Sequence, residues 1–332
     1  MKLVRFTPMD GGAANGSGAR LGVLQGERIG ELNTHTLGLP ADKAAWFESM
    51  LAFIAAGDEA KAAVAERMGR LFENPQAIHA LGAVRLLAPF MPSSILCSGS
   101  NYHAHNKEKA GSPLSGKEPE FFVKTSDCVI GPDDAIIHDP RHTKKLDCET
   151  ELAIIIGKAG RHIPLESALD HVYGYSIIND VTARDLQVRR KPDGSTFYEL
   201  GRGKMFDTSA PFGPCIVTAD DIPDPQRLRI RTRINGELRQ SGNTSDMIWS
   251  CAELVHFFSS SFTLRPGMVI ITGTPAGTAW SVDAELGGKW SPPEEPEEDG
   301  EQVVPAKGYN QAGDRIESEI EGIGVLRNVV TL

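Results

Sequence analysis

The chain has 332 residues and a formal net charge of −10, with 40% hydrophobic and 23% charged residues. This length allows one large domain or two smaller ones with an ample core. The acidic balance argues against nucleic acid or an anionic membrane surface as a partner. No apolar run approaches the ~18 residues that a membrane-spanning helix needs.

The five cysteines are scattered along the chain and form no C-x-x-C pair. This usage is typical of reduced, buried thiols and argues against a disulfide framework or a cysteine-based zinc site. The first residues, MKLVRFTP, enter a strand directly and include no apolar signal region. We therefore expect a cytoplasmic protein.

Residues 1–85 are expected to form a small α+β N-terminal domain. Three strand-like segments come first, at residues 2–6, 20–24 and 28–32. The pattern turns helical from residue 41 to about residue 73, and Gly57 and Asp58 divide it into two helices. No residue pattern in this domain indicates chemistry.

The remaining residues, 86–332, are rich in predicted strands. Short apolar runs recur between turn residues, at 94–97, 121–124, 135–138, 152–156, 173–178, 215–218, 228–234 and 269–272. One helix is expected over residues 245–259. Many strands without an alternating βα rhythm predict a mainly β (α+β) fold with antiparallel or mixed pairing, not a doubly wound nucleotide fold.

A long segment at about residues 280–308 stands out by its charge. Its residues 291–302, SPPEEPEEDGEQ, carry six acids, no base and three prolines. Such a composition predicts a solvated, poorly ordered loop.

The most informative stretch is the apolar strand that begins near Glu149 and ends before Gly157. Because side chains alternate along a strand, Glu149 and Glu151 point the same way, about 6.5–7 Å apart along the chain. Two carboxylates beside an apolar strand repel each other, and a divalent cation that takes an oxygen from each resolves the conflict. The alternative is a pair of solvated glutamates at a strand edge.

Asp180 ends the next apolar strand and is the candidate third oxygen ligand. Together with Glu149 and Glu151 it would form an all-carboxylate triad suited to Mg²⁺ or Mn²⁺ rather than zinc. Asp180 could instead cap a helix that begins after it.

His105 and Glu108 stand three residues apart in the segment that precedes the central strand. On a helix they would share a face, and a carboxylate that holds one imidazole nitrogen leaves the other as a base near neutral pH. A polar surface turn is the competing interpretation. Lys124 and Lys204, each beside aromatic residues, could neutralise the carboxylates or extend along the surface into solvent.

The last candidate is the glycine-rich turn at residues 272–278, TGTPAGT, which leaves a short apolar strand. Its backbone amides and threonine hydroxyls could bind a carboxylate or enolate oxygen. It lacks the G-K-[ST] ending of a phosphate-binding loop, so nucleotide binding is not expected.

Taken in order, these motifs resemble the fumarylacetoacetate hydrolase family. The resemblance runs from about residue 95 to residue 330 and rests on GSNYxxHxxE, FFVK, DCETELAIIIGK, GYSIINDVTARDLQ, GRGKMFD, NGELRQ, TGTPAGT and the closing GDRIESEIEGIGVLRN. It implies a mixed β-sandwich roll for the larger domain and a homodimer. Residues 1–85 resemble, with weaker motifs, the small N-terminal domain that many members carry.

The resemblance also implies roles for individual residues. Mg²⁺ or Mn²⁺ would be held by Glu149, Glu151 and Asp180. The catalytic residues would be His105 and Glu108, as a water-activating pair, and Lys204 beside the metal. The substrate contacts would be Lys124, Arg184, Gln187 and Thr274.

The expected activity is hydrolysis of a C–C bond in a 2,4-dioxo acid, such as an acylpyruvate or fumarylpyruvate, with pyruvate leaving as its enolate. The alternatives are a decarboxylase or isomerase of a 2-oxo dicarboxylic acid, of the oxaloacetate or 2-oxohept-3-enedioate type, or a dehydratase or hydrolase of a 2-oxo-3-deoxy sugar acid. A non-catalytic binding protein on the same scaffold is a further alternative. Ser100 stands where acylpyruvate hydrolases and related oxaloacetate decarboxylases carry Arg, so their substrate does not transfer directly.

Overall fold

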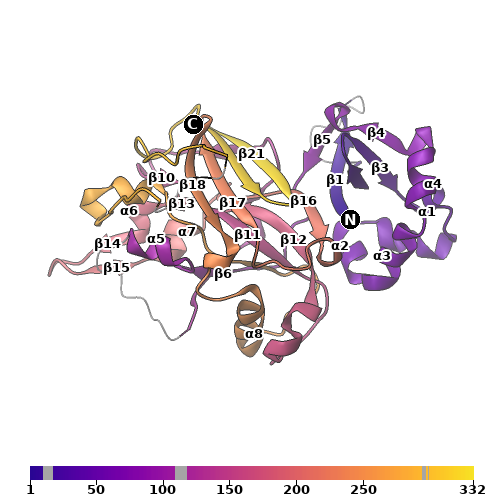
Figure 1. Ribbon diagram of the computed structural model, residues 1–332, viewed down its shortest axis with the longest axis horizontal. Helices are drawn as coiled ribbons and strands as arrows, with labels where there is room; N and C mark the ends of the chain where they lie inside the picture. Colours follow the sequence, from indigo (N-terminus) through magenta and orange to yellow (C-terminus); the bar gives the residue numbers. More distant parts are fainter. Residues whose placement is uncertain (10–17, 109–117, 294–296, 298) are drawn as a thin grey trace.

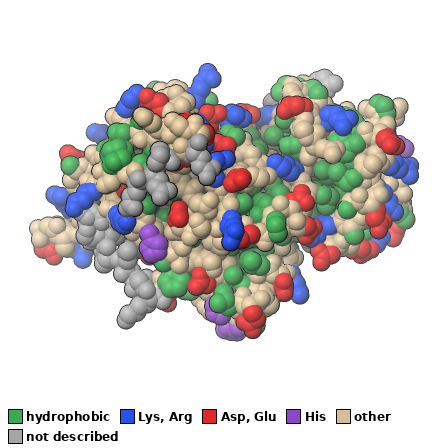
Figure 2. Space-filling view, viewed as in Figure 1, with side chains coloured by type: hydrophobic (Ala, Val, Ile, Leu, Met, Phe, Trp, Pro, Cys, Tyr) green, Lys and Arg blue, Asp and Glu red, His purple; other side chains and the backbone are tan. Residues whose placement is uncertain are grey.

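The computed structural model describes residues 1–9, 18–108, 118–293, 297 and 299–332. It confirms a mainly β architecture built from mixed sheets (Figure 1). None of the helices in these ranges is long and apolar enough to cross a membrane. The five cysteines are all buried free thiols. Figure 2 shows acidic and basic side chains interspersed over one face of the molecule.

The N-terminal residues form a strand-rich unit with its own helices at one end of the long axis (Figure 1). Its strands are β1 (Lys2–Pro8), β2 (Arg20–Gln25), β3 (Arg28–Leu32), β4 (Ile78–Ala80) and β5 (Val84–Leu87). Its helices are α1 (Thr34–Leu37), α2 (Met50–Ala55), α3 (Gly57–Ala65) and α4 (Met68–Glu73). The predicted break at Gly57 is confirmed, but the second of the two predicted helices is divided into α3 and α4. Strands β4 and β5 are additional. The predicted domain boundary near residue 85 stays a prediction.

A 12-stranded sheet runs from this unit into the rest of the chain, in the order β4-β3-β2-β1-β16-β12-β11-β19-β6-β7, with β5 beside β1 and β8 beside β16. Its further strands are β6 (Ile95–Gly99), β7 (Glu120–Lys124), β8 (Val129–Ile130), β11 (Thr150–Ile156), β12 (Val172–Asn179), β16 (Ala210–Thr218) and β19 (Val269–Ile271). The central strands β11 and β12 are antiparallel neighbours and buried along their whole length.

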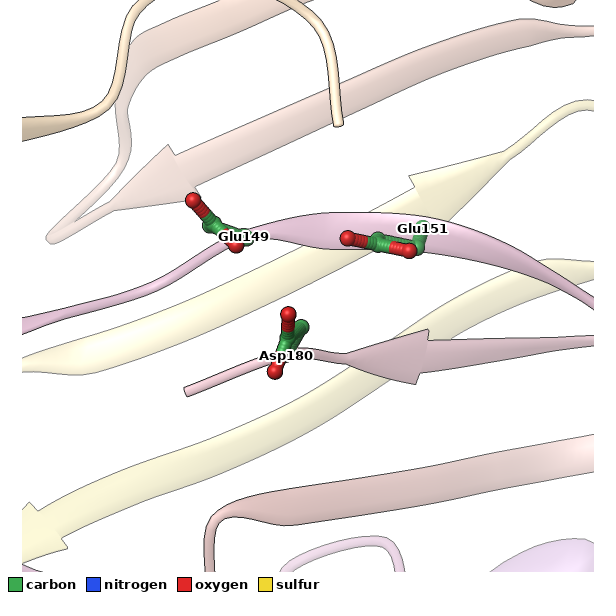
Figure 3. A group of neighbouring side chains, drawn as sticks. All are labelled: Glu149, Glu151 and Asp180. Atoms are coloured by element: carbon green, nitrogen blue, oxygen red, sulfur yellow. The ribbon is translucent and has the colours of Figure 1, made fainter. Parts of the chain in front are cut away.

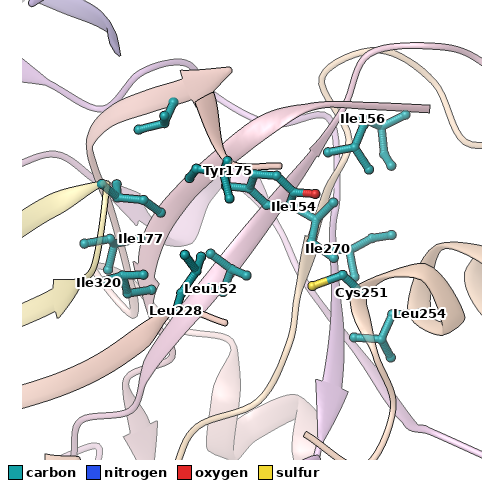
Figure 4. Close-up of a cluster of buried hydrophobic side chains, with 14 of the residues drawn as sticks. Leu152, Ile154, Ile156, Tyr175, Ile177, Leu228, Cys251, Leu254, Ile270 and Ile320 are labelled. Atoms are coloured by element: carbon teal, nitrogen blue, oxygen red, sulfur yellow. The ribbon is translucent and has the colours of Figure 1, made fainter. Parts of the chain in front are cut away.

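A five-stranded sheet, in the order β18-β17-β20-β21-β9, packs against the central strands. Its strands are β9 (Ala135–Ile137), β17 (Arg229–Ile234), β18 (Glu237–Asn243), β20 (Arg315–Ile320) and β21 (Gly324–Thr331). The core between the sheets contains Leu152 and Ile177 from the large sheet and Ile320 from the small one (Figure 4). Alternate residues of β11 thus enter this core from one face, which leaves the other face for a second core.

Short elements surround the end of the central strands. They are α5 (His103–Lys107), β10 (Leu146–Asp147), β13 (Thr182–Ala183), α6 (Arg184–Gln187), β14 (Val188–Arg190), β15 (Thr196–Tyr198) and α7 (Leu200–Lys204). The helix predicted over residues 245–259 begins later, as α8 (Cys251–Ser261). The reason is the capping box between Ser250 and Glu253, which fixes the first turn there.

The acidic segment is attached to the small sheet at its described residues. Arg231 of β17 pairs with Glu297 and Asp299, both at 2.6 Å, and Arg233 pairs with Glu301 at 2.5 Å. The composition predicts a solvated, poorly ordered loop over residues 291–302, and it does not reveal that arginines of a distant strand pair with three of its acids. Residues 294–296 and 298 of this segment lie outside the described residues.

Candidate active site

Three buried carboxylates gather where the central strands end. Glu149 precedes β11, Glu151 lies on it, and Asp180 follows the antiparallel neighbour β12 (Figure 3). The pairing of Thr150 with Asn179 and a 2.8 Å hydrogen bond from Asp180 N to Glu149 O bring the two strand ends together. Each side chain offers an oxygen within 4.8 Å of the other two. The predicted proximity of the three carboxylates is therefore confirmed.

Two lysines and an arginine partly balance this negative charge. Lys204 Nζ lies 2.5 Å from Glu149 Oε2 and 2.6 Å from Asp180 Oδ2. Arg184 pairs with the other oxygen of Glu149, and Lys124 Nζ lies 2.9 Å from Asp180 Oδ1. Glu149 and Asp180 are thus held by cations on both of their oxygens.

Glu151 has different surroundings. It accepts a hydrogen bond from Gly273 N at 2.6 Å, and among the described residues no cationic group pairs with it within 4.0 Å. Burial and the negative charges of Asp180 and Glu149 raise the pKa of Glu151 well above its usual value of 4.5. Burial alone would also raise the pKa of Glu149, but Arg184, Lys204 and His105 outweigh it and lower the pKa of that residue.

This donor set fits a divalent metal ion. Three buried carboxylates supply only oxygen ligands, which Mg²⁺ and Mn²⁺ prefer, and no cysteine or histidine ligand of the kind zinc favours belongs to the group. A bound cation would offset the negative charges of Asp180 and Glu149, which raise the pKa of Glu151. Glu149, Glu151 and Asp180 could therefore hold such an ion.

A histidine on α5 and the glutamate that caps the end of this helix lie beside the triad. His105 Nδ1 is 3.1 Å from Glu108 Oε2, and both side chains are buried. Because an ionised carboxylate only accepts hydrogen bonds, Nδ1 is the nitrogen that donates to Glu108. His105 Nε2 lies 3.9 Å from Glu149 Oε1 and thus faces the carboxylates. The predicted His105–Glu108 pairing is confirmed.

The glycine-rich turn contacts protein carboxylates with its amides. Gly273 N donates to Glu151, and Gly277 N donates to Glu108 Oε1 at 2.7 Å. A Cβ atom at Gly277 would lie 1.9 Å from Arg239 O, so only glycine fits there. These two amides therefore hold the candidate ligand and the carboxylate beside the histidine, a role that the motif alone does not predict.

A small cavity of about 30 Å³ opens onto the triad. The predicted substrate residues Arg184, Gln187 and Thr274 line it, as does Ser100. Lys124 lies behind Asp180 instead, where its ammonium donates to the carbonyl of Ser209 at 2.8 Å. Asp180 does not cap the following helix, because α6 begins only at Arg184 and its N-cap residue is Ala183.

Asp147 is a buried member of the site that spacing does not reveal. Its carboxylate binds the guanidinium of Arg184 at 2.8 Å and the backbone N–H of Ala279 at 2.9 Å. The signal is present in the sequence as the acid of the DCETE motif. Its partner Ala279, however, stands more than one hundred residues further along the chain.

Residues 94–331 match the fumarylacetoacetate (FAA) hydrolase C-terminal family. Oxaloacetate tautomerase YisK from Bacillus subtilis is 39% identical over 255 residues, which covers 76% of this chain and 75% of the relative. The mitochondrial oxaloacetate tautomerase fahd2 of Xenopus laevis is 34% identical over 331 residues, which covers 99% of this chain and 90% of the relative.

Solved structures show the same fold. A fumarylacetoacetate hydrolase from psychrophilic Exiguobacterium antarcticum superposes with a TM-score of 0.72 at 37% identity, covering 100% of this chain and 99% of that one. Maleylpyruvate hydrolase from Sphingobium sp. SYK-6, in complex with manganese(II) ion and pyruvate, gives 0.71 at 28% identity with the same coverage. On these grounds the chain belongs to the fumarylacetoacetate hydrolase family.

Proposed function

We propose that this protein is a divalent-metal-dependent enzyme that moves a proton on a small 2-oxo dicarboxylic acid, with keto–enol tautomerisation of oxaloacetate as its reaction. The observation that carries this proposal is the buried His105–Glu108 pair, whose second imidazole nitrogen lies 3.9 Å from Glu149 Oε1, one member of the carboxylate triad. The relatives named oxaloacetate tautomerase support the choice of substrate. Arg184 and Gln187 line the cavity beside the triad, where they could bind a carboxylate of such an acid.

The proposed mechanism assigns one task to each residue. Glu149, Glu151 and Asp180 would hold Mg²⁺ or Mn²⁺, which would supply a Lewis acid for the 2-oxo acid. Tautomerisation moves one proton between the C2 oxygen and C3, and His105 exchanges the proton at C3. Glu108 keeps the imidazole in the tautomer that can accept it. Lys204, whose ammonium lies among the carboxylates, supplies positive charge near the developing enolate.

The second candidate is hydrolysis of a C–C bond in a 2,4-dioxo acid, which the sequence motifs also predict. The same histidine would take a proton from water, the water would attack the C4 carbonyl, and pyruvate would leave when the C3–C4 bond breaks. A histidine oriented by a carboxylate is the arrangement that activates water, and a structural relative is named maleylpyruvate hydrolase. A homodimer and a cytoplasmic location stay predictions.

The two candidates are separated by parallel assays with added Mn²⁺. One assay follows the loss of the enol of oxaloacetate by its ultraviolet absorbance, and the other measures pyruvate released from acylpyruvates and fumarylpyruvate. We expect fast ketonisation and little pyruvate. Abundant pyruvate with no acceleration of ketonisation would favour the hydrolase, and no activity in either assay would contradict both.

His105→Ala tests the base in the same assays. The rate should fall by ~10²–10⁴, the usual contribution of a general base. The matched control is His103→Ala, because His103 is exposed on the same helix two residues earlier. It should keep the wild-type rate. An unchanged rate in His105→Ala would show that this histidine is not the base.

A further inference from the structure

Asp147 is the point where three separate segments of the site meet. It is 1% exposed, and its carboxylate accepts hydrogen bonds from four N–H donors. Oδ1 accepts from Cys148 N at 3.0 Å and Ala279 N at 2.9 Å. Oδ2 accepts from Arg184 Nε at 2.8 Å and Trp280 N at 3.2 Å. One carboxylate therefore joins the start of the triad strand, helix α6 and the segment after the glycine-rich turn.

Arg184 connects Asp147 with two residues that line the cavity. Its remaining nitrogens donate to Glu149 Oε1 and, at 2.9 Å, to Gln187 Oε1. The guanidinium is planar, so fixing Nε on Asp147 also fixes the directions of the other two nitrogens. The side chain of Trp280 stacks on it with the ring centroid 5.1 Å from Cζ, which restricts the plane further.

Gln187 and Glu149, the two other partners of the Arg184 guanidinium, both line the cavity. Arginine only donates hydrogen bonds, so the amide of Gln187 must present its oxygen to Arg184. The NH₂ group of the same amide is not used in this bond with Arg184, and Gln187 lines the cavity. On the triad side, Arg184 occupies Oε1 of Glu149 and Lys204 occupies Oε2, which fixes the orientation of that carboxylate.

We propose that Asp147 is a positioning residue that acts through Arg184, setting the orientation of Glu149 toward a divalent metal and of the Gln187 amide toward an anionic oxygen of the substrate. The inference rests on the proposed metal-dependent function and adds to it a residue that touches neither metal nor substrate. Partners of this kind typically change metal affinity by about 10–100-fold when they are replaced.

The test is Mn²⁺ binding to the chelator-treated full-length protein, measured as free Mn²⁺ by electron paramagnetic resonance without any turnover. Asp147→Asn keeps an amide oxygen for Cys148 N and Ala279 N but turns an N–H donor toward Arg184. We expect its dissociation constant for Mn²⁺ to rise by about 10–100-fold. At saturating Mn²⁺, the KM for oxaloacetate should also rise, because Gln187 loses its orientation.

The matched control is Asp283→Asn. Asp283 is an acid in the segment after the glycine-rich turn, and its side-chain partners are Lys145 at 2.7 Å and the hydroxyl of Tyr309 at 2.6 Å rather than Arg184. It should bind Mn²⁺ as the wild type does. If Asp147→Asn does not fold, Asp147→Glu is the second variant, since it keeps the charge and moves the carboxylate by one methylene; it should weaken Mn²⁺ binding at least fivefold.

A double-mutant cycle with Arg184→Lys separates positioning from general structural support. Lysine keeps the charge but cannot contact three acceptors in one plane. If Asp147 acts through Arg184, adding Asp147→Asn to Arg184→Lys should change the dissociation constant less than threefold. An equal loss in both backgrounds, or wild-type affinity in the folded Asp147 variants, would overturn the inference. Absence of Mn²⁺ binding by the wild type would instead overturn the proposed function.

Discussion

Glu149 and Glu151 stand two residues apart at the start of β11, yet their electrostatic surroundings are opposite. Arg184, Lys204 and His105 overcome the effect of burial on Glu149 and lower its pKa, whereas burial, Asp180 and Glu149 raise the pKa of Glu151. The cationic neighbours therefore favour the ionised form of the first carboxylate. A bound cation would favour the ionised form of the second.

This contrast predicts how metal binding depends on pH. Glu151 must lose a proton to donate to a cation, so protons and Mn²⁺ compete for it below its raised pKa. The affinity for Mn²⁺ should rise with increasing pH from the usual value of 4.5 upward, by about tenfold per unit until Glu151 is ionised. Calorimetric titrations in two buffers of different ionisation enthalpy measure both the affinity and the proton released. A constant affinity without proton release would contradict this role of Glu151.

The proximity of site residues that are close in sequence could be predicted from their spacing. Glu149 and Glu151 stand two residues apart in extended backbone, and His105 stands three residues before Glu108 at the end of α5, so the proximity of each pair follows from local backbone geometry. Long-range contacts were not predictable in this way. The position of Lys124 behind Asp180 and the bond from Asp147 to Ala279 both depend on how distant segments pack.

The segment between the glycine-rich turn and β20 contacts both Glu108 at the end of α5 and the small sheet. Near its start, Lys289 N donates to the carbonyl of Glu108 at 2.9 Å. Further on, Glu297, Asp299 and Glu301 pair with the arginines of β17. One end of the segment thus touches the histidine–glutamate helix, and the other is fastened to the small sheet by charge.

Because ion pairs attach residues 297, 299 and 301 to β17, we predict that this attachment weakens as the salt concentration rises. Arg231→Met should make residues 297–301 more accessible to a protease, because two of their acids lose their partner at 2.6 Å. In the wild type, raising NaCl from 0.1 to 1 M should have a similar effect, since the screening length falls from about 10 Å to about 3 Å. The control is Arg227→Met, whose ion pair with Asp224 is exposed. Equal cleavage of wild type and Arg231→Met at low salt would contradict the attachment.

The fold class could be predicted from the strand pattern, but the pairing between the N-terminal unit and the rest of the chain could not. Short apolar runs predict strands wherever they occur, and most expected strands are present with small shifts of their ends. Nothing local indicates that β1 pairs with β16, with Lys2 opposite Val217. This pairing spans more than two hundred residues and is decided by the shared core.

The N-terminal unit and the remaining chain share a continuous hydrophobic core. Leu3 and Phe53 from the first unit pack in one cluster with Ile216 and Val269 from the second. The N-terminal ammonium group of Met1 also pairs with Asp221 at 2.6 Å. A core that crosses the junction couples the stability of both parts.

We therefore predict a single cooperative thermal transition by calorimetry. Leu3→Ala should lower the free energy of unfolding by about 2–5 kcal/mol, because Leu3 is fully buried. Leu165→Ala, at a position that is 44% exposed, should change it by less than about 0.5 kcal/mol. Two separate transitions, with only one shifted by Leu3→Ala, would show that the parts unfold independently.

The central claim is that Glu149, Glu151 and Asp180 hold a divalent metal ion beside His105. Its most direct test is the number of Mn²⁺ ions bound per chain by chelator-treated wild type and by Glu151→Gln, which keeps the size of the side chain and removes its charge. We predict one tightly bound ion in the wild type and binding at least 100-fold weaker in the folded variant. Equal binding by the two proteins would contradict the account.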